Sequence, residues 1–260
     1  MHRFINGIKV FLQGDSAAQP IIFIHGFPFE HTLWDDVIEQ LKDDYYCISY
    51  DLRGFGSSEV GHGQYTMESY VDDLETLISR LGLEQVILCG FSMGGYIALR
   101  ANERLQNLKA LILANTSTSS DNDEAKLKRA KAIQGIEKEG VEPFLESFFT
   151  AAFTQSYLKE HQDRIALLKE KILTFDPIGV KGGLLAMISR TDTTQSLEKT
   201  PTTLLIGASD DAIIAPKIMK EIASKMKNSH YVELQDSGHV SMLEKPKEFV
   251  KALKSFLIKN

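Results

Sequence analysis

A serine lies between glycines at the spacing that a catalytic nucleophile needs. Ser92 stands in the run Gly-Phe-Ser-Met-Gly-Gly at 90–95, after a short apolar run and before a helical pattern. Glycines two positions before and after it leave room for a sharp strand-to-helix turn, which projects the hydroxyl beyond the strand. The amide of Met93 then lies at a helix N-terminus, where backbone N–H groups can bind an anion. These residues predict attack on a carbonyl carbon by Ser92.

The base that this serine requires is predicted at His239. It ends the run Ser-Gly-His at 237–239, shortly after the apolar run 231–234. An imidazole titrates near pH 6.5, so at neutral pH it can take the serine proton and return it to a leaving group. A loop that leaves the last strand of a sheet can bring His239 to Ser92.

Two adjacent aspartates compete for the role of the acid that orients His239. The apolar run 202–206 is followed by Gly-Ala-Ser-Asp-Asp at 207–211. A carboxylate there would hold the imidazole in the right tautomer and stabilise its cation. Only one of the two can face inward, and we predict Asp210, with Asp211 as the alternative.

A different source of the acid would be the strand predicted at 108–114. The residue that follows it is Asn115, which has no carboxylate, so that an acid from this strand would have to be Asp121 or Asp123. We therefore prefer the aspartates that follow the run 202–206.

A second loop is expected to complete the anion site. His-Gly-Phe-Pro at 25–28 follows the apolar run 21–24 and would lie beside the serine turn in a sheet. The N–H of Phe27, together with that of Met93, would form an oxyanion hole aimed at the charge of a tetrahedral intermediate. For His25 we expect a structural role, because the base comes after the acid in the chain order serine, aspartate, histidine.

The run Asp-Leu-Arg-Gly-Phe-Gly-Ser-Ser at 51–58 is interpreted as a tight structural loop. The side chains of Asp51 and Arg53 can form hydrogen bonds to the backbone of this loop. It lacks the Gly-x-x-x-x-Gly-Lys spacing of a phosphate loop. No metal-ligand spacing and no dinucleotide fingerprint is found along the chain, so we expect neither a metal nor another cofactor.

Short apolar runs alternate with helical patterns along most of the sequence. Asn-Gly at 6–7 separates two β-like runs and predicts a hairpin. Further strands are predicted at 21–25, 45–50, 86–89, 108–114, 202–206 and 231–234, and helices at 34–42, 67–81, 93–104, 215–226 and 246–258. This alternation predicts an α/β fold, a mostly parallel sheet with helices on both faces.

The interval 120–195 interrupts that alternation. It holds several helical patterns, at 123–139, 143–153, 161–173 and 180–188, and no convincing strand. We interpret it as a helical cap insert over the edge of the sheet, with 1–119 and 196–260 forming the core.

Aromatic residues line one side of a helix in this interval. They are Phe144, Phe148, Phe149 and Phe153. Packing between the cap and the core is the simpler interpretation of this cluster, and lining of a substrate pocket is the alternative.

The composition is that of an ordinary globular protein, with 43% hydrophobic and 25% charged residues and a net charge of −6. Such an acidic chain lacks the basic face of a nucleic-acid-binding protein. No apolar run approaches the roughly 20 residues that span a bilayer, and the N-terminus lacks a signal-peptide core, so we expect a cytoplasmic protein without membrane association. Cys47 and Cys89 lie in apolar runs and are expected to be buried strand residues.

Together these motifs resemble the α/β-hydrolase superfamily. The runs that carry the likeness, in the expected order and over nearly the whole chain, are 25–28, 51–58, 90–95, 207–210 and 238–239. The sequence is most similar to small bacterial esterases and enol-lactonase-like members, which carry a helical cap at the position of 120–195. A serine at position 92 disfavours the members with an aspartate nucleophile, which are dehalogenases and epoxide hydrolases.

The resemblance implies acyl transfer by a Ser-His-Asp triad without a cofactor. Ser92 would be the nucleophile, His239 the base and Asp210 the acid, and the amides of Phe27 and Met93 would form the oxyanion hole. One departure from the family pattern is visible, because Pro216 lies further past the acid than usual. That spacing keeps the choice between Asp210 and Asp211 open.

The implied activity is hydrolysis of a carboxylic ester of a small molecule through an acyl-enzyme. The same triad could act on thioesters, lactones or carbon–carbon bonds beside a ketone, and the motifs do not separate these substrates. A function of another class is a ligand-binding receptor that kept the fold and lost the chemistry. Against the receptor, no position of the triad has been replaced.

Overall fold

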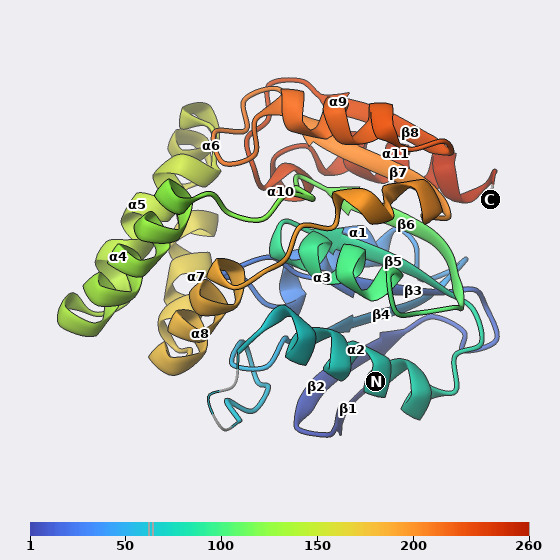
Figure 1. Ribbon diagram of the computed structural model, residues 1–260, viewed down its shortest axis with the longest axis horizontal. Coiled ribbons are helices and arrows are strands. Elements are labelled where there is room, and N and C mark those ends of the chain that lie inside the picture. Colours follow the sequence, from blue (N-terminus) through green and yellow to red (C-terminus); the bar gives the residue numbers. More distant parts are fainter. Residues whose placement is uncertain (62, 64, 260) are drawn as a thin grey trace.

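The computed structural model describes residues 1–61, 63 and 65–259. Residues 62, 64 and 260 belong to the segments 1–119 and 196–260 that are predicted to form the core domain, and they lie outside the described residues. Within that part of the chain, eight strands form one sheet in the order β1-β2-β4-β3-β5-β6-β7-β8 (Figure 1). The strands are β1 (His2–Ile5), β2 (Ile8–Gln13), β3 (Pro20–Ile24), β4 (Tyr46–Tyr50), β5 (Val86–Phe91), β6 (Leu108–Ala114), β7 (Thr202–Ala208) and β8 (Ser229–Leu234). The pairs β1–β2 and β2–β4 are antiparallel and the other neighbours are parallel, which confirms the predicted α/β sheet.

The first two strands form the hairpin that Asn6-Gly7 predicts. Both turn residues have positive φ, +49° for Asn6 and +76° for Gly7. Two successive residues of this kind match the right-handed twist of a hairpin. Ile5 pairs with Ile8 directly across the turn, so that the register is fixed by the turn itself.

The central strands are buried on both faces, as expected of parallel strands between two helical layers. The apolar residues 21–24 of β3 have no exposed surface. Cys47 in β4 and Cys89 in β5 are free and buried, which confirms their interpretation as strand residues.

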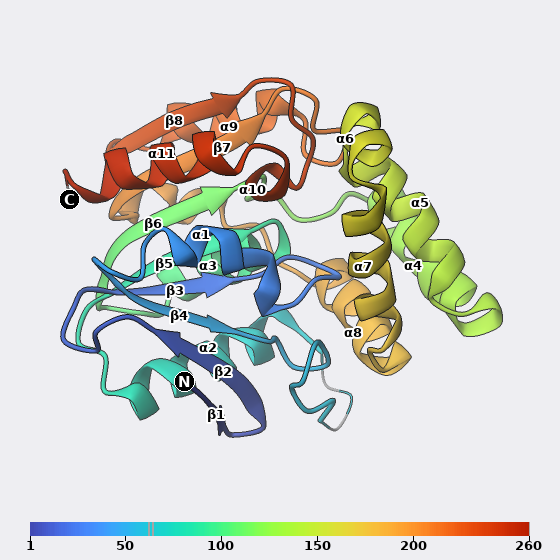
Figure 2. The ribbon, with the colours of Figure 1, turned by 180° about the vertical axis from the view of Figure 1, so that it is seen from behind.

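Helices cover both faces of the sheet (Figures 1 and 2). On one face lie α2 (Met67–Leu81), α3 (Met93–Asn102) and α9 (Pro216–Lys225), and on the other lie α1 (Asp35–Glu39) and α11 (Pro246–Leu257). The bounds of α2 follow from local chemistry, because Thr66 and Ser69 form a reciprocal capping box at its start and Gly82 ends it at a φ of +66°. The 3-10 helices η1 (His31–Trp34) and η2 (Thr194–Lys199) and the short helix α10 (Ser241–Glu244) complete this part of the fold.

Five helices occupy residues 123–188 between β6 and β7, and we refer to them as the cap helices. They are α4 (Asp123–Glu139), α5 (Glu142–Ala152), α6 (Gln155–Glu160), α7 (Gln162–Leu173) and α8 (Pro177–Ile188). Figures 1 and 2 place them beyond the carboxyl ends of the parallel strands. The interval is helical as expected, with α6 in addition, and its division from the core at 120 and 195 stays a prediction.

Candidate active site

Ser92 occupies a strained turn between β5 and α3. Its φ is +50° and its ψ is −114°, a conformation that serine rarely adopts. A side-chain carbon at Gly90 would collide with the backbone of Gly94, and one at Gly94 would collide with the carbonyl oxygen of Ile24. The two glycines are therefore required because the elbow packs directly against neighbouring backbone.

Three side chains meet at the end of this turn. The Nε2 of His239 lies 2.9 Å from the Oγ of Ser92, and the Nδ1 of His239 lies 2.8 Å from the Oδ2 of Asp211. An ionised carboxylate can only accept, so Nδ1 donates to Asp211 and Nε2 is left to accept from the hydroxyl. All three residues are buried, with exposed fractions of 8% for Ser92, 1% for His239 and 4% for Asp211.

The prediction that Asp210 contacts the histidine is wrong, and the alternative aspartate does so instead. The carboxylate of Asp210 accepts from the hydroxyl of Ser209 at 2.7 Å, on the exposed side of the loop. Asp211 faces inward because its Oδ1 accepts from the amides of Ile213 and Ile214, both at 2.8 Å, which closes a local turn around the carboxylate.

Asn115 supports this carboxylate. It is the residue whose lack of a carboxylate argued against an acid from the neighbouring strand β6. Its Nδ2 donates to Asp211 at 2.9 Å, and its Oδ1 accepts from the hydroxyl of Ser241 at 2.6 Å. Burial by itself raises the pKa of Asp211, but the positive charge of His239 in its protonated form, the hydrogen bond from His239 and the further donors outweigh it and lower that pKa. Asp211 is therefore ionised at neutral pH.

The loop that carries Phe27 lies beside the serine turn. Strand β3 pairs in parallel with β5, with Ile24 opposite Gly90, so that both loops leave the sheet at the same edge. A tight turn, in which Phe29 N–H donates to the Gly26 carbonyl at 2.9 Å, shapes the loop. Met93 begins α3, whose first N–H groups have no partner within the helix. The role of the Phe27 and Met93 amides as an oxyanion hole stays a prediction.

His25 is held by backbone groups at both ring nitrogens. Its Nδ1 donates to the carbonyl of Gly26 at 2.9 Å, and its Nε2 accepts from the amide of Leu52 at 3.0 Å. Burial lowers its pKa, which favours the neutral ring that this bonding pattern needs. These contacts agree with the structural role expected for His25.

Asp51 organises its loop as expected, since it accepts from the amide of Ser57 at 2.8 Å. Arg53 pairs instead with the side chain of Asp73 in α2 at 2.6 Å, so its bonding to the loop backbone stays a prediction. A group of possible metal ligands was not foreseen, because it joins Glu30 and His31 to the distant Asp51.

This group is an ion-paired cluster at neutral pH. The Nδ1 of His31 lies 2.6 Å from Asp51 and 3.0 Å from Glu30. Burial by itself lowers the pKa of His31, but the two carboxylates outweigh it and raise that pKa to about 9. A metal ligand must be a deprotonated imidazole, so a metal ion would have to displace this proton in order to bind here.

The aromatic side of α5 packs on the loop that follows β3. The ring of Phe27 lies 5.7 Å from that of Phe144 and 6.3 Å from that of Phe148, in edge-to-face contacts. Phe29 makes similar contacts with Phe148 and Phe149. These contacts agree with packing between the cap helices and the sheet, and they put apolar rings close to the residue whose amide is predicted to bind the oxyanion.

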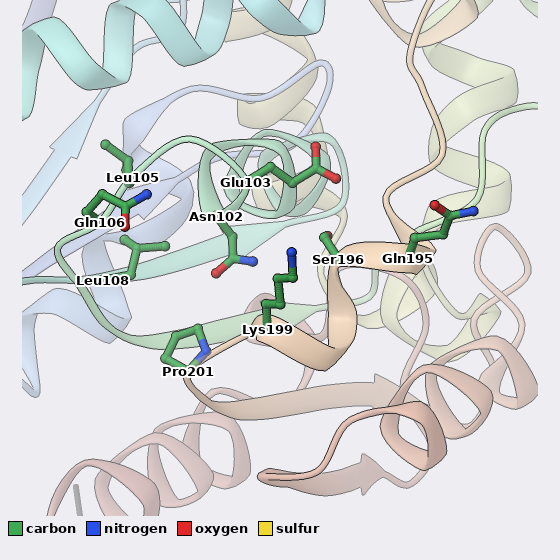
Figure 3. Close-up of a pocket in the computed structure, with 9 residues that line it drawn as sticks. All are labelled: Asn102, Glu103, Leu105, Gln106, Leu108, Gln195, Ser196, Lys199 and Pro201. Atoms are coloured by element: carbon green, nitrogen blue, oxygen red, sulfur yellow. The ribbon is translucent and has the colours of Figure 1, made fainter.

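A separate pocket of about 680 Å³ lies at the amino ends of the parallel strands, whereas the triad lies at their carboxyl ends (Figure 3). It opens between the end of α3 and η2, near the amino ends of β6 and β7, where Glu103 and Lys199 face solvent. The residues that line it include none of the triad, so it is not the space that a substrate of Ser92 would occupy.

Comparisons with known proteins agree with this architecture. A family model described as the alpha/beta hydrolase fold matches residues 19–246. A thermophilic esterase from Thermogutta terrifontis is 32% identical, with a TM-score of 0.93 over 100% of this chain and 98% of that chain. The AB hydrolase superfamily protein YisY of Bacillus subtilis is 29% identical over 95% of this chain and 94% of its own length.

An enol-lactonase is a more distant relative. The 3-oxoadipate enol-lactonase 1 of Acinetobacter baylyi is 23% identical over 96% of this chain and 92% of its own length. Among the described residues, no helix combines the length and the apolar composition that crossing a membrane requires.

Proposed function

We propose that this chain, which belongs to the α/β-hydrolase family, is a serine hydrolase that cleaves carboxylic esters of a small molecule. The observation that carries the proposal is the unbroken line of hydrogen bonds from Ser92 through His239 to Asp211. A nucleophile, a base and an orienting acid in this order are the parts that acyl transfer requires. The 32% identity to an esterase over the full chain supports the choice of ester.

The first half of the reaction forms an acyl-enzyme. Ser92 Oγ attacks the ester carbonyl while His239 Nε2 takes the hydroxyl proton. The amides of Phe27 and Met93 would stabilise the oxygen anion of the tetrahedral intermediate. His239 then gives its proton to the departing alcohol as the ester bond breaks. The ionised Asp211 holds Nδ1–H throughout and stabilises the transient imidazolium.

The second half regenerates the enzyme. A water molecule gives a proton to His239 and attacks the acyl carbon. The new tetrahedral intermediate collapses, the bond to Ser92 Oγ breaks, and His239 returns its proton to that oxygen. The products are one alcohol and one carboxylic acid, and no redox step is involved.

The test is turnover of a short-chain aryl ester by Ser92→Ala. We expect kcat to fall by roughly 10⁴-fold or more, because removal of a triad nucleophile abolishes the covalent route. Ser79→Ala, at an exposed serine of α2, is the matched control and should keep full activity. Full turnover by Ser92→Ala would refute the proposal.

Labelling with a fluorophosphonate separates the enzyme from a receptor of the same fold. Mass spectrometry should find the label on Ser92 of folded wild-type protein. Failure of Ser92 to react in folded protein would favour the receptor.

The 23% identity to an enol-lactonase makes lactones the second substrate class to assay. Lactone or thioester turnover far above that of esters would replace the ester proposal while keeping the triad.

A further inference from the structure

The loop that carries His239 is bonded directly to the cap helices. The backbone N–H of His239 donates at 2.8 Å to the carbonyl of Ala152, the last residue of α5, and that of Val240 points to the same oxygen at 3.4 Å. Ala152 has no exposed surface. The main chain of the catalytic base is thus held by a carbonyl that lies 87 positions away in the sequence, between the positions 152 and 239.

A second link between the same two segments runs through the side chain of Glu244. Its Oε1 accepts from the N–H of Gly238 at 3.0 Å. Its Oε2 accepts from the hydroxyl of Thr154 at 2.6 Å and from the Thr154 N–H at 3.3 Å. One carboxylate therefore bridges the residue before His239 to the start of α6. Figures 1 and 2 show its helix, α10, on the side of the sheet that faces the cap helices.

The two segments touch so closely that only glycine fits at position 238. A side-chain carbon there would lie 2.9 Å from the Ala152 carbonyl oxygen and 3.1 Å from the Thr154 nitrogen. It would also lie 2.7 Å from the Oε1 of Glu244. The bridge therefore works at contact distance, and a small displacement of either segment would move the imidazole.

The charge of Glu244 is held in a partly desolvated position. Burial raises its pKa, against the hydrogen bonds from Thr154 and Gly238, and the nearby charge of Asp210 raises it further. The carboxylate is matched in this place by three donors, the Gly238 N–H and the N–H and hydroxyl of Thr154. Such an arrangement is expected where the position of the loop that carries His239 is important for catalysis.

We propose that Glu244 is a positioning residue for His239. Through its bridge, the position of the catalytic imidazole depends on how the cap helices pack against the loop that carries it. The inference rests on the proposed serine-hydrolase function. Loss of the carboxylate leaves the Gly238 and Thr154 amides without their acceptor and frees the loop to shift. Because catalysis depends steeply on the alignment of nucleophile and base, such a shift lowers kcat more than substrate affinity.

The experiment compares Glu244→Ala and Glu244→Gln with Glu248→Ala. Glu248 is exposed on α11 and tests the loss of a carboxylate alone. We expect Glu244→Ala to lower kcat by about 10- to 100-fold with KM changed less than about twofold. Glu244→Gln keeps an acceptor for the Gly238 amide and should fall between wild type and Glu244→Ala. Glu248→Ala should match wild type.

A spectroscopic readout separates positioning from a purely structural role. The proton on His239 Nδ1, bonded to Asp211 at 2.8 Å, should give a strongly deshielded ¹H signal in the wild type. That signal should broaden or shift in Glu244→Ala and less so in Glu244→Gln, in protein that is folded at the assay temperature by thermal melting. If Glu244→Ala does not fold, the graded loss in Glu244→Gln carries the test.

Two outcomes would overturn the inference, and both are distinct from failure of the proposed function. One is wild-type kcat in the Glu244 variants with only a lowered melting temperature. The other is a lower kcat with an unchanged His239 proton signal. Turnover that depends on Ser92 in the same assays, together with either outcome, would leave the hydrolase proposal standing and remove only the role of Glu244.

Discussion

At the scale of single residues, the choice between two adjacent carboxylates decides the chemistry of the site. Asp211 accepts four hydrogen bonds from described residues, including those from His239 and Asn115. Asp210 is one peptide unit away, and its carboxylate accepts from the hydroxyl of the adjacent Ser209 on the exposed side of the loop. Neighbouring residues on a tight loop point in different directions, so the two identical side chains have unequal roles.

Substitution of the two aspartates should give very different results. We expect Asp211→Asn to lower kcat for a short-chain ester by about 10⁴-fold, because an amide cannot hold His239 in the required tautomer. Asp210→Asn is the matched control and should remain within about twofold of wild type, as expected for an exposed polar residue. Steady-state kinetics at pH 7 measure both, and equal losses in the two variants would contradict the assignment of Asp211.

At the scale of elements, charged clusters join loops that leave different strands. Glu30 and His31 follow β3, Asp51 follows β4, and Lys171 reaches Glu30 from α7 at 2.9 Å. Burial by itself raises the pKa of Glu30. Several interactions outweigh burial and lower this pKa to about 2, and the largest of them are the hydrogen bonds from His31 and Thr32. The cluster thus connects two strand ends to a cap helix.

The stability that His31 contributes should depend on pH. Its pKa is raised to about 9 in the folded protein, from about 6.5 when unfolded, so its ion pairs stabilise the fold fully below the lower value. That contribution is lost as the pH rises through about 9. Thermal melting should therefore give a gap between wild type and His31→Gln that is largest near pH 6 and shrinks toward pH 10.

The exposed histidine at position 230 supplies the control for this series. His230→Gln should melt with the same pH dependence as wild type. A gap between wild type and His31→Gln that stays constant from pH 6 to pH 10 would show that His31 contributes no ion pair.

At the scale of the whole molecule, the two linkers that join the cap helices to the sheet are bound to each other and to α4. The carboxylate of Asp121 pairs with Arg190 at 3.0 Å and with Arg129, and the side chains of Asp121 and Arg190 are only 5% and 7% exposed. The N–H of Thr193 donates to the carbonyl of Thr118 at 3.0 Å, which binds the outgoing linker to the incoming one.

Because the linkers are bound in this way, and because α5 packs on Phe27 and Phe29 of the core, the sheet and the cap helices should unfold together. Trp34 is the single tryptophan and is fully buried against the sheet, so its fluorescence reports on the core. Far-UV circular dichroism reports on helices, including all of the cap. We expect the two signals to give one coincident denaturant transition.

Arg190→Met should lower the free energy of unfolding by about 1.5–3 kcal/mol, the usual contribution of a hydrogen bond to a charged group. Lys128→Met, at an exposed lysine of α4, should leave it unchanged. A helical signal that is lost at lower denaturant than the fluorescence of wild-type protein would contradict a cooperative molecule.

The sequence by itself determined the features that short-range chemistry controls. Asn6-Gly7 required a hairpin because both residues accept positive φ, and the alternation of apolar runs with helical patterns required a mostly parallel sheet. The glycines around Ser92 indicated the elbow, because only they avoid the neighbouring backbone. These patterns depend on residues a few positions apart, so they can be seen without coordinates.

Only the tertiary structure decided which distant groups meet. Asp211 was selected over Asp210 by donors from Asn115 and His239, which lie 96 and 28 positions away, and the late Pro216 was the one sequence signal for it. The bridge made by Glu244 could not be seen in the sequence, since Gly238 lies only 6 positions away but its other partner, Thr154, lies 90 positions away. The direction of a side chain on a tight loop depends on partners that the fold supplies, and a single sequence does not contain their positions.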